Sequence, residues 1–176
     1  NWQEDSNLDF KSLKKAIGQK SDVESLAETC VCFANAQGGK LVIGIENKES
    51  EPPANQKVNI EEMNKVVSRL RSLTDGVGLA NPEIIKHNNG GEYFVINILP
   101  SSRIIATTSS GKVFIRITDN CYAVKSEELT DLAAEKNAFQ WELVVAQKVT
   151  IQQADAEQYN FFVNNIRKSN KVSDFI

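Results

Sequence analysis

The sequence has few of the residues that most often carry metal, nucleophilic or membrane chemistry. Its 176 residues include one histidine, one methionine and three cysteines. An odd number of cysteines without a C-x-x-C pair argues against a structural zinc site, and reduced thiols are the simple interpretation. No apolar run approaches the roughly 20 residues that cross a bilayer, and no signal peptide is visible. We therefore expect a cytoplasmic protein with no membrane partner.

The chain also lacks a net positive charge. Its 20 Lys and Arg residues are outnumbered by 23 Asp and Glu residues, so its formal net charge is −3. This composition gives no general attraction for nucleic acid, and any nucleic-acid site must be a local basic patch. The sequence contains no G-x-x-x-x-G-K-[ST] loop, so a Walker-type nucleotide site is not supported.

The clearest structural pattern lies in residues 21–46. Ser21 and Glu24 form a capping-box pattern that predicts a helix start. Apolar residues then recur at the spacing of an amphipathic helix, at Val23, Leu26, Ala27, Cys30, Val31 and Ala34. Asn35 and the Gly38-Gly39 pair end this helix. The apolar run at 41–45 that follows is typical of a strand buried on both faces.

The rest of the chain alternates between strand and helix patterns. We expect strands near 8–10, 83–87, 92–99, 104–106 and 113–117, and strand-like alternation over 139–145. Helices are expected after the cap Asn59, with Ile60 on the apolar face, from Ser126 to about Lys136, and at 156–168. These patterns predict an α+β fold in which a mixed, mostly antiparallel sheet is packed with helices, plus a C-terminal helical extension.

Three motifs in order resemble the Schlafen-type AlbA-like domain. FANAQGG and LVIGIE, within 33–46, are similar to the family's FANTxGGxLxIGVxD segment, and the preceding Asp9-Phe10-Lys11 is similar to its EFK. FIRI, CYA and EEL, within 114–129, are similar to its YVRxGSxTxxAxxEEIxxL. Residues 150–167 resemble the helix that follows in bacterial relatives. The resemblance implies a domain at 1–136, with 137–176 as a connector and helix leading to further domains of a longer polypeptide.

The resemblance also implies an acidic site. Schlafen members that cleave RNA use two glutamates five residues apart and an aspartate after the IGVD strand. Glu4 and Asp9 match the first two positions in spacing, with Asp in place of the second Glu, and the third position is Asn47. Clustered carboxylates recruit a divalent metal such as Mg²⁺, and an amide is a weaker ligand. A metal-dependent endoribonuclease is therefore kept as an alternative, beside ordinary surface acids.

The glycine turn is a second candidate site. Gly38 and Gly39 allow backbone N–H groups to approach a phosphate, with Asn35 beside them and Lys40 as a counter-charge. However, the helix precedes the glycines, and a helix C-terminus is electronegative. A tight connection between helix and strand is the other interpretation. The family is often labelled ATP-binding, so the resemblance implies ATP as a ligand.

Basic residues form the third candidate site. Lysines precede the central helix, and arginines lie on or beside later strands, at Lys11, Lys14, Lys15, Arg103 and Arg116. Such side chains position nucleic acid through its phosphates without reading sequence; a solvated face or internal salt bridges would explain them equally. We predict a DNA- or RNA-binding module of a bacterial transcriptional regulator. The alternatives are the nuclease or nucleotide-binding domain above, and a homodimerisation module that uses the last helix.

Overall fold

The computed structural model describes residues 6–47, 49–141, 160 and 164. The chain divides into two compact units, residues 1–139 and 140–176. The helix expected at 156–168 lies outside the described residues, apart from Asn160 and Asn164. The fold is α+β as predicted, with a mixed, mostly antiparallel sheet packed with helices and the C-terminal helix α4 (Ser126–Trp141).

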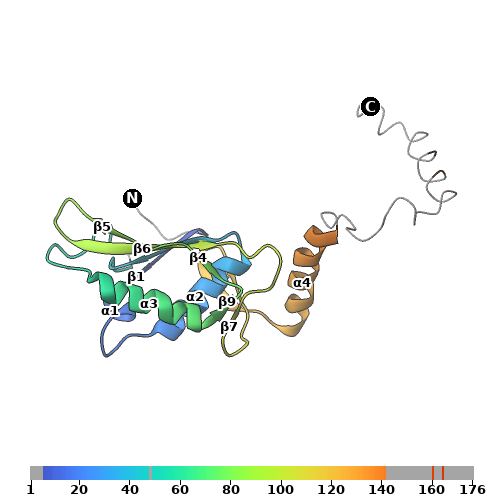
Figure 1. The fold of residues 1–176 in the computed structure, drawn as a ribbon, viewed down its shortest axis with the longest axis horizontal. Helices are drawn as coiled ribbons and strands as arrows, with labels where there is room; N and C mark the ends of the chain where they lie inside the picture. Colours follow the sequence, from blue (N-terminus) through green and yellow to red (C-terminus); the bar gives the residue numbers. More distant parts are fainter. Residues whose placement is uncertain (1–5, 48, 142–159, 161–163, 165–176) are drawn as a thin grey trace. The chain divides into compact units, whose positions relative to one another are not determined.

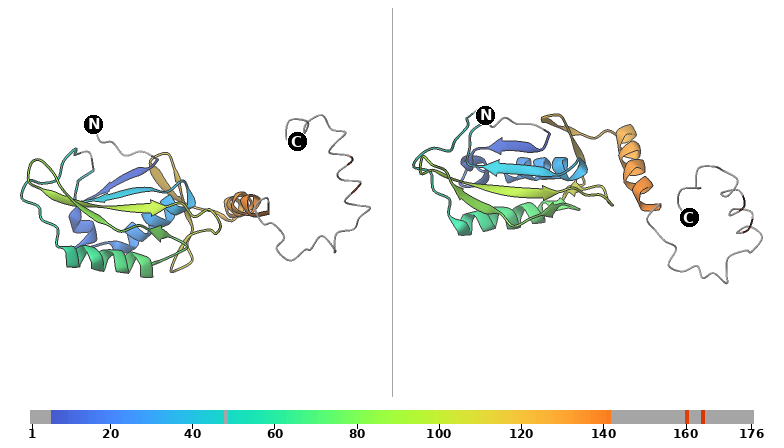
Figure 2. Two further views of the ribbon diagram at one scale, coloured as in Figure 1. Left: turned by 45° about the horizontal axis from the view of Figure 1, so that its top comes forward. Right: turned by 90° about the horizontal axis from the view of Figure 1, so that it is seen from above.

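The main sheet has five strands in the order β1-β2-β6-β4, with β5 also pairing with β6. β1 (Leu8–Lys11) runs parallel to β2 (Gly39–Ile43), and all other pairs are antiparallel. β6 (Glu92–Leu99) has β2 along one side, and β5 (Glu83–Lys86) and β4 (Gly78–Leu79) along the other. β1 is therefore an edge strand, opposite the edge formed by β4 and β5 (Figure 2).

Helices α2 (Val23–Asn35) and α3 (Ile60–Ser72) cover one face of this sheet (Figure 1). The residues of β2 alternate between the two faces: Leu41 and Ile43 join the core beneath the helices, and Val42 joins a smaller cluster on the other face. Each fully buried aliphatic side chain of this kind contributes about 1.5–3 kcal/mol. The predicted strand buried on both faces is thus confirmed, although it ends at Ile43.

The helix starts differ in detail from the predicted ones. The N-cap of α2 is Asp22, whose carboxylate accepts a hydrogen bond from Ser25 N at 3.1 Å, so the predicted capping box at Ser21 is wrong by one residue. Glu24 instead pairs with Arg69 of α3 at 2.9 Å. Asn59 caps α3 as predicted. Ile60 is 61% exposed, because it lies in the first turn, ahead of the buried stripe.

Two small sheets complete the unit. β3 (Thr74–Asp75) pairs with β7 (Thr107–Thr108), and β8 (Phe114–Ile117) pairs with β9 (Asn120–Ala123) as a hairpin. The strand expected at 104–106 is therefore displaced to β7. Residues 139–141, expected to be strand-like, are the last part of α4.

The cysteines correct another expectation. Cys32 of α2 and Cys121 of β9 form a disulfide, with their Cα atoms 5.9 Å apart and a separation of 89 residues in the sequence. Local spacing carries no signal for so distant a pair, which explains why reduced thiols were expected. Cys30 is buried and unpaired.

Candidate nucleic-acid interface

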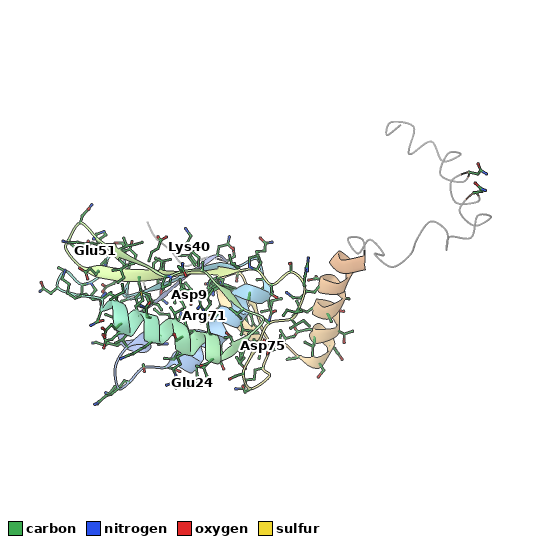
Figure 3. The ribbon with its side chains drawn as sticks, in the orientation of Figure 1. Asp9, Glu24, Lys40, Glu51, Arg71 and Asp75 are labelled. Carbon is green, nitrogen blue, oxygen red and sulfur yellow. A yellow bond between two sulfur atoms is a disulfide. The ribbon has the colours of Figure 1, made fainter. Side chains whose placement is uncertain are left out.

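The edge strand β1 brings an acid and a base together. The Lys11 Nζ atom lies 2.7 Å from Oδ1 and 2.6 Å from Oδ2 of Asp9. Asp9 is only 4% exposed, and Figure 3 places it within the body of sheet and helices, whereas Glu24 and Glu51 lie at the periphery. The two residues form a partly buried ion pair. The ammonium group of Lys11 is therefore engaged by Asp9 and is not available to an external phosphate.

Two further lysines follow β1 directly. Lys14 and Lys15 lie on the short helix α1 (Leu13–Ala16) and are both exposed. The next residue of this helix, Ala16, is only 3% exposed and packs in the core. This anchoring holds the two ammonium groups at the surface beside the carboxyl end of β1. Of the predicted basic residues, these two are best placed to meet a ligand.

Arg116 has a different environment from the one expected. It is only 7% exposed, and its guanidinium lies 4.4 Å from the ring centroid of Phe33, a cation–π distance. Its Nη2 donates to the Leu8 carbonyl oxygen at 3.1 Å. Arg116 therefore joins the β8–β9 hairpin to α2 and to the edge strand β1.

Asn35 is also engaged within the chain. Its side chain is buried and hydrogen-bonds the backbone of Ala106 and Phe114. The amide joins the end of α2 to the segments before β7 and in β8. The side-chain amide of Asn35 therefore has a structural role within the chain.

The glycine turn is filled by protein atoms. A Cβ on Gly38, whose φ is +74°, would lie 2.6 Å from the Ile98 carbonyl oxygen, and one on Gly39 would lie 2.5 Å from the Phe33 ring. Both glycines are therefore required by the close approach of β6 and α2. This geometry favours the tight connection between helix and strand over a phosphate cradle.

Arg103 lies at the other end of the sheet from Lys14 and Lys15. It is exposed in the loop after β6, and β6 ends beside Gly39, at the amino end of β2. Nearby, Lys136 of α4 donates to the Ser101 carbonyl oxygen, and burial lowers the pKa of its ammonium group. The predicted basic residues are thus divided between the two ends of the sheet rather than gathered at one point.

The structure describes two of the three positions of the predicted acidic site, Asp9 and Asn47. Glu4 lies outside the described residues. Asn47 is exposed beyond the carboxyl end of β2, where Gly44 turns the chain with φ +119°. In the part of the chain that the structure describes, no three His, Cys, Asp or Glu side chains are grouped as a metal site requires. Asp9, with its carboxylate held by Lys11, is the one described acid of the predicted pair.

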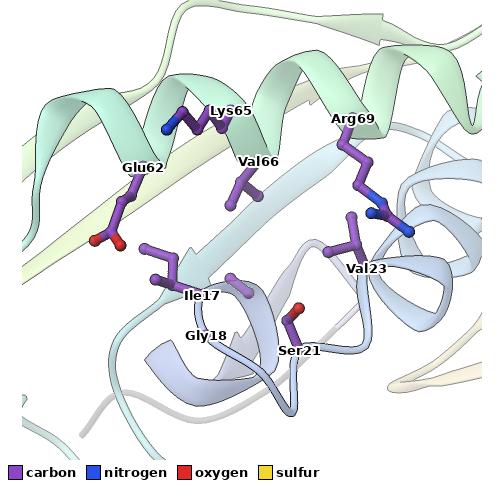
Figure 4. Close-up of a pocket in the computed structure, with 9 residues that line it drawn as sticks. Ile17, Gly18, Ser21, Val23, Glu62, Lys65, Val66 and Arg69 are labelled. Carbon is purple, nitrogen blue, oxygen red and sulfur yellow. The ribbon is translucent and has the colours of Figure 1, made fainter.

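A pocket of about 190 Å³ lies between α3 and the segment joining α1 to α2 (Figure 4). Ile17, Val23 and Val66 give it an apolar lining, Glu62 and Arg69 extend towards it from α3, and Lys65 also lines it. The volume is below the roughly 300–1,000 Å³ of typical small-molecule sites. Its charges are nearly balanced, because Glu62 lies beside Lys65 and Arg69 is paired with Glu24. The pocket therefore gives little support to the ATP alternative.

Two basic residues that line the pocket, Lys65 and Arg69, were not among the site residues predicted from the sequence. Lys65 and Arg69 are four residues apart on α3, a spacing that places them on one helix face. Only the packing of α3 against the loop after α1 brings this face near Ile17 and Gly18.

No helix in the described residues is long and apolar enough to cross a membrane.

Comparison with known proteins places this geometry in context. The chain shares its fold with the crystal structure of the DIP2311 protein from Corynebacterium diphtheriae, at a TM-score of 0.54 and 19% identity. The similarity covers 74% of this chain but only 24% of that one. No curated protein matches the sequence.

A family model gives the stronger assignment. The model for Schlafen, AlbA_2 matches residues 4–125, well over half of the chain. This family is associated with nucleic-acid binding in general. The chain therefore belongs to the Schlafen AlbA_2 family.

Proposed function

We propose that this domain binds nucleic acid through phosphate contacts beside the carboxyl end of the β1 edge, as the DNA-binding part of a cytoplasmic, transcriptional-regulator-like protein. The observation that carries the proposal is the pair of exposed ammonium groups on Lys14 and Lys15, which the short helix α1 holds directly after the edge strand β1. The association of the family with nucleic acid supports the same ligand class.

The edge has the dimensions of a short stretch of backbone. Four residues of β1 extend over about 13 Å at roughly 3.3 Å each, which corresponds to about four nucleotide steps of 3.4 Å. Lys14 and Lys15 would contact phosphates at the carboxyl end of β1, and Arg103, in the loop after β6, would contact a phosphate farther along the ligand. Arg116 would act through position, because its guanidinium holds the β8–β9 hairpin against Leu8.

The test is binding of labelled single- and double-stranded DNA, RNA and ATP, measured by fluorescence anisotropy at two salt concentrations, with and without Mg²⁺. The test variant is Lys14→Ala/Lys15→Ala. The control is Lys57→Ala/Lys86→Ala, which removes the same charge from the opposite side of the sheet: Lys86 lies on β5, and Lys57 pairs with Glu92 of β6.

We expect the test variant to bind a polynucleotide more weakly. The negative slope of log K against log salt should become shallower by about 1.4–1.8, since each of the two lost phosphate contacts contributes about 0.7–0.9 to its magnitude. The control should keep the wild-type slope. Equal losses in the two variants would show a general charge effect and reject the β1 edge as the site. Cleavage of the nucleic acid that requires Mg²⁺ would favour the endoribonuclease instead, and binding of ATP alone would favour a nucleotide-binding domain.

Homodimerisation through the last helix stays a prediction. Light scattering on the chain with and without residues 156–176 separates it from the binding proposal. An unchanged mass would count against the helix as the dimer contact, whatever the outcome of the anisotropy experiment.

A further inference from the structure

The β8–β9 hairpin is joined to the rest of the unit without strand pairing. Its two strands form a sheet of their own. Phe114 and Arg116 pack against the core and the Phe33 ring, and three specific bonds add to this packing: Asn35 Nδ2 to the Phe114 carbonyl oxygen at 2.9 Å, Arg116 Nη2 to the Leu8 carbonyl oxygen at 3.1 Å, and the Cys32–Cys121 disulfide. The disulfide is the one covalent link among these three.

The two sulfur-bearing residues differ in access. Cys32 lies in the last turn of α2 and has no exposed surface, whereas Cys121 lies on β9, whose four residues are all exposed. The Nη1 atom of Arg116 lies 3.9 Å from Cys121 Sγ. A neighbouring guanidinium stabilises a thiolate, so a released Cys121 would be a good thiolate and Cys32 a poor one.

The third cysteine does not compete in this chemistry. Cys30 is fully buried, and burial, together with the nearby Asp9 carboxylate, raises the pKa of its thiol to about 12. It therefore stays protonated at neutral pH, where the thiol form does not exchange with disulfides.

We propose that Cys32–Cys121 is a reversible redox link that sets how tightly the β8–β9 hairpin is held against α2, and that Cys121 is the sulfur that exchanges with small thiols of the glutathione class. The inference does not depend on nucleic-acid binding. In a reducing compartment a disulfide of this kind is transient rather than permanent, which gives the link two states to switch between.

The reaction is ordinary thiol–disulfide exchange and needs no other reactant. A glutathione thiolate attacks Cys121 Sγ, forms a mixed disulfide there, and displaces Cys32 as a thiolate that takes a proton from water. A second glutathione thiolate then attacks the glutathione sulfur of the mixed disulfide. Oxidised glutathione leaves with one new sulfur–sulfur bond, and Cys121 is released as the thiolate beside Arg116. Two electrons pass from two glutathione molecules to the protein, and oxidised glutathione reverses the sequence.

Reduction removes the covalent link but leaves the two hydrogen-bonded ones. The hairpin would then open locally more often, while β2 and β6 in the interior of the main sheet, which contain none of the paired cysteines, keep their protection. The expected change is therefore confined to residues 113–124 and to the adjoining strand β1.

The first experiment uses the unaltered chain. It is equilibrated in reduced or oxidised glutathione, the paired cysteines are mapped by mass spectrometry of peptides, and amide hydrogen exchange is followed in both states. We expect a Cys32–Cys121 peptide only in the oxidised state and about tenfold faster exchange over 113–124 in the reduced state, with β2 and β6 unchanged. Equal exchange over 113–124 in the two states, or no Cys32–Cys121 peptide after oxidation, would overturn the proposal.

A matched pair of variants tests which sulfur exchanges. In Cys32→Ala the exposed Cys121 is left alone, and in Cys121→Ala the buried Cys32 is left alone. We expect oxidised glutathione to form a mixed disulfide with Cys121 at least about tenfold faster than with Cys32. Similar rates, or faster reaction at Cys32, would contradict the assignment of Cys121. Circular dichroism verifies that each variant is folded, and the experiment on the unaltered chain holds if one is not.

Discussion

The side chain of Asn35 forms a two-way hydrogen bond with the backbone of Ala106. Its Nδ2 atom donates to the Ala106 carbonyl oxygen and its Oδ1 atom accepts from the Ala106 N–H group, each at 2.8 Å. The same Nδ2 atom also donates to the Phe114 carbonyl oxygen. One buried amide at the end of α2 thus fixes two segments that lie more than 70 residues later in the chain.

Replacing Asn35 should therefore destabilise the whole unit. Asn35→Ala would leave the Ala106 N–H group and two carbonyl oxygens without these partners, and each unsatisfied buried group costs about 1–3 kcal/mol. We expect a loss of roughly 3 kcal/mol in urea unfolding, and a similar loss for Asn35→Asp, because a carboxylate cannot donate to the two carbonyls. Gln37→Ala, at an exposed position two residues on, is the control. A loss below about 1 kcal/mol for Asn35→Ala would show that water replaces the amide.

The glycine turn gives a second prediction. Gly39→Ala would place a methyl group 2.5 Å from the Phe33 ring and 2.8 Å from the Asn7 carbonyl oxygen, so α2 and β1 would have to move apart. We expect a loss of about 1–3 kcal/mol from overpacking. Gly111→Ala, where φ is +78° and no atom lies within 4 Å of the new carbon, carries backbone strain alone and should cost less. Thermal unfolding of both variants measures the difference. Because Gly39 does not have a positive φ, a cost for Gly39→Ala no greater than that for Gly111→Ala would show that the neighbouring atoms move aside for the methyl group.

The ion pair on β1 leads to a third prediction. In Lys11→Met the Asp9 carboxylate would remain buried without its ammonium partner, and breaking a buried pair in this way costs about 3–5 kcal/mol. The side chain of Lys11 is 20% exposed, so we expect a value near the lower limit, about 3 kcal/mol. Adding Asp9→Asn should restore part of the loss. If the double variant is no more stable than Lys11→Met, the loss comes from packing and not from the stranded charge.

Glu92 makes stability depend on pH. Hydrogen bonds from Lys57 Nζ and from the Val58 N–H group lower the pKa of its carboxyl below the usual 4.5. Between that lowered pKa and 4.5 the unfolded chain binds more protons than the folded one, so this stabilisation is present above pH 4.5 and is lost as the pH falls through the folded pKa.

Glu92→Gln should thus be less stable than wild type near neutral pH, and the difference should shrink as the solution is acidified. Urea unfolding over that range measures it. Glu83→Gln, at an exposed position on β5, should leave the wild-type pH profile unchanged. A difference between Glu92→Gln and wild type that persists at low pH would contradict the role of the carboxylate.

The parts predicted well from sequence are those with strong local patterns. The apolar stripe of α2, the Asn59 cap and the turn between β5 and β6 are each set by residues close together in the chain, and all three occur in the structure. Pairings between distant segments carry no such local signal. The Cys32–Cys121 disulfide and the contact of Arg116 with Leu8, 108 residues apart, belong to this class.

The candidate site shows the same division. Charge and residue type identified the lysines before α2, but only the fold distinguishes exposed Lys14 and Lys15 from Lys11, which is paired with Asp9. Arg116 matches a family motif, and by residue type alone it is as good a candidate for phosphate binding as the lysines. Its burial against Phe33 depends on how the hairpin packs on α2, which composition and spacing do not determine.

The contact between Arg116 and Leu8 also affects how the protein behaves in concentrated solution. Because the carbonyls of Asn7 and Lys11 face β2, the alternating carbonyl of Leu8 faces the outer side of the edge strand, where a strand of another molecule could add. Arg116 occupies that acceptor with a charged group, which no incoming strand can displace without leaving a cation buried. The hairpin therefore protects the chain against edge-to-edge aggregation, and its loosening would carry a cost in solubility as well as in stability.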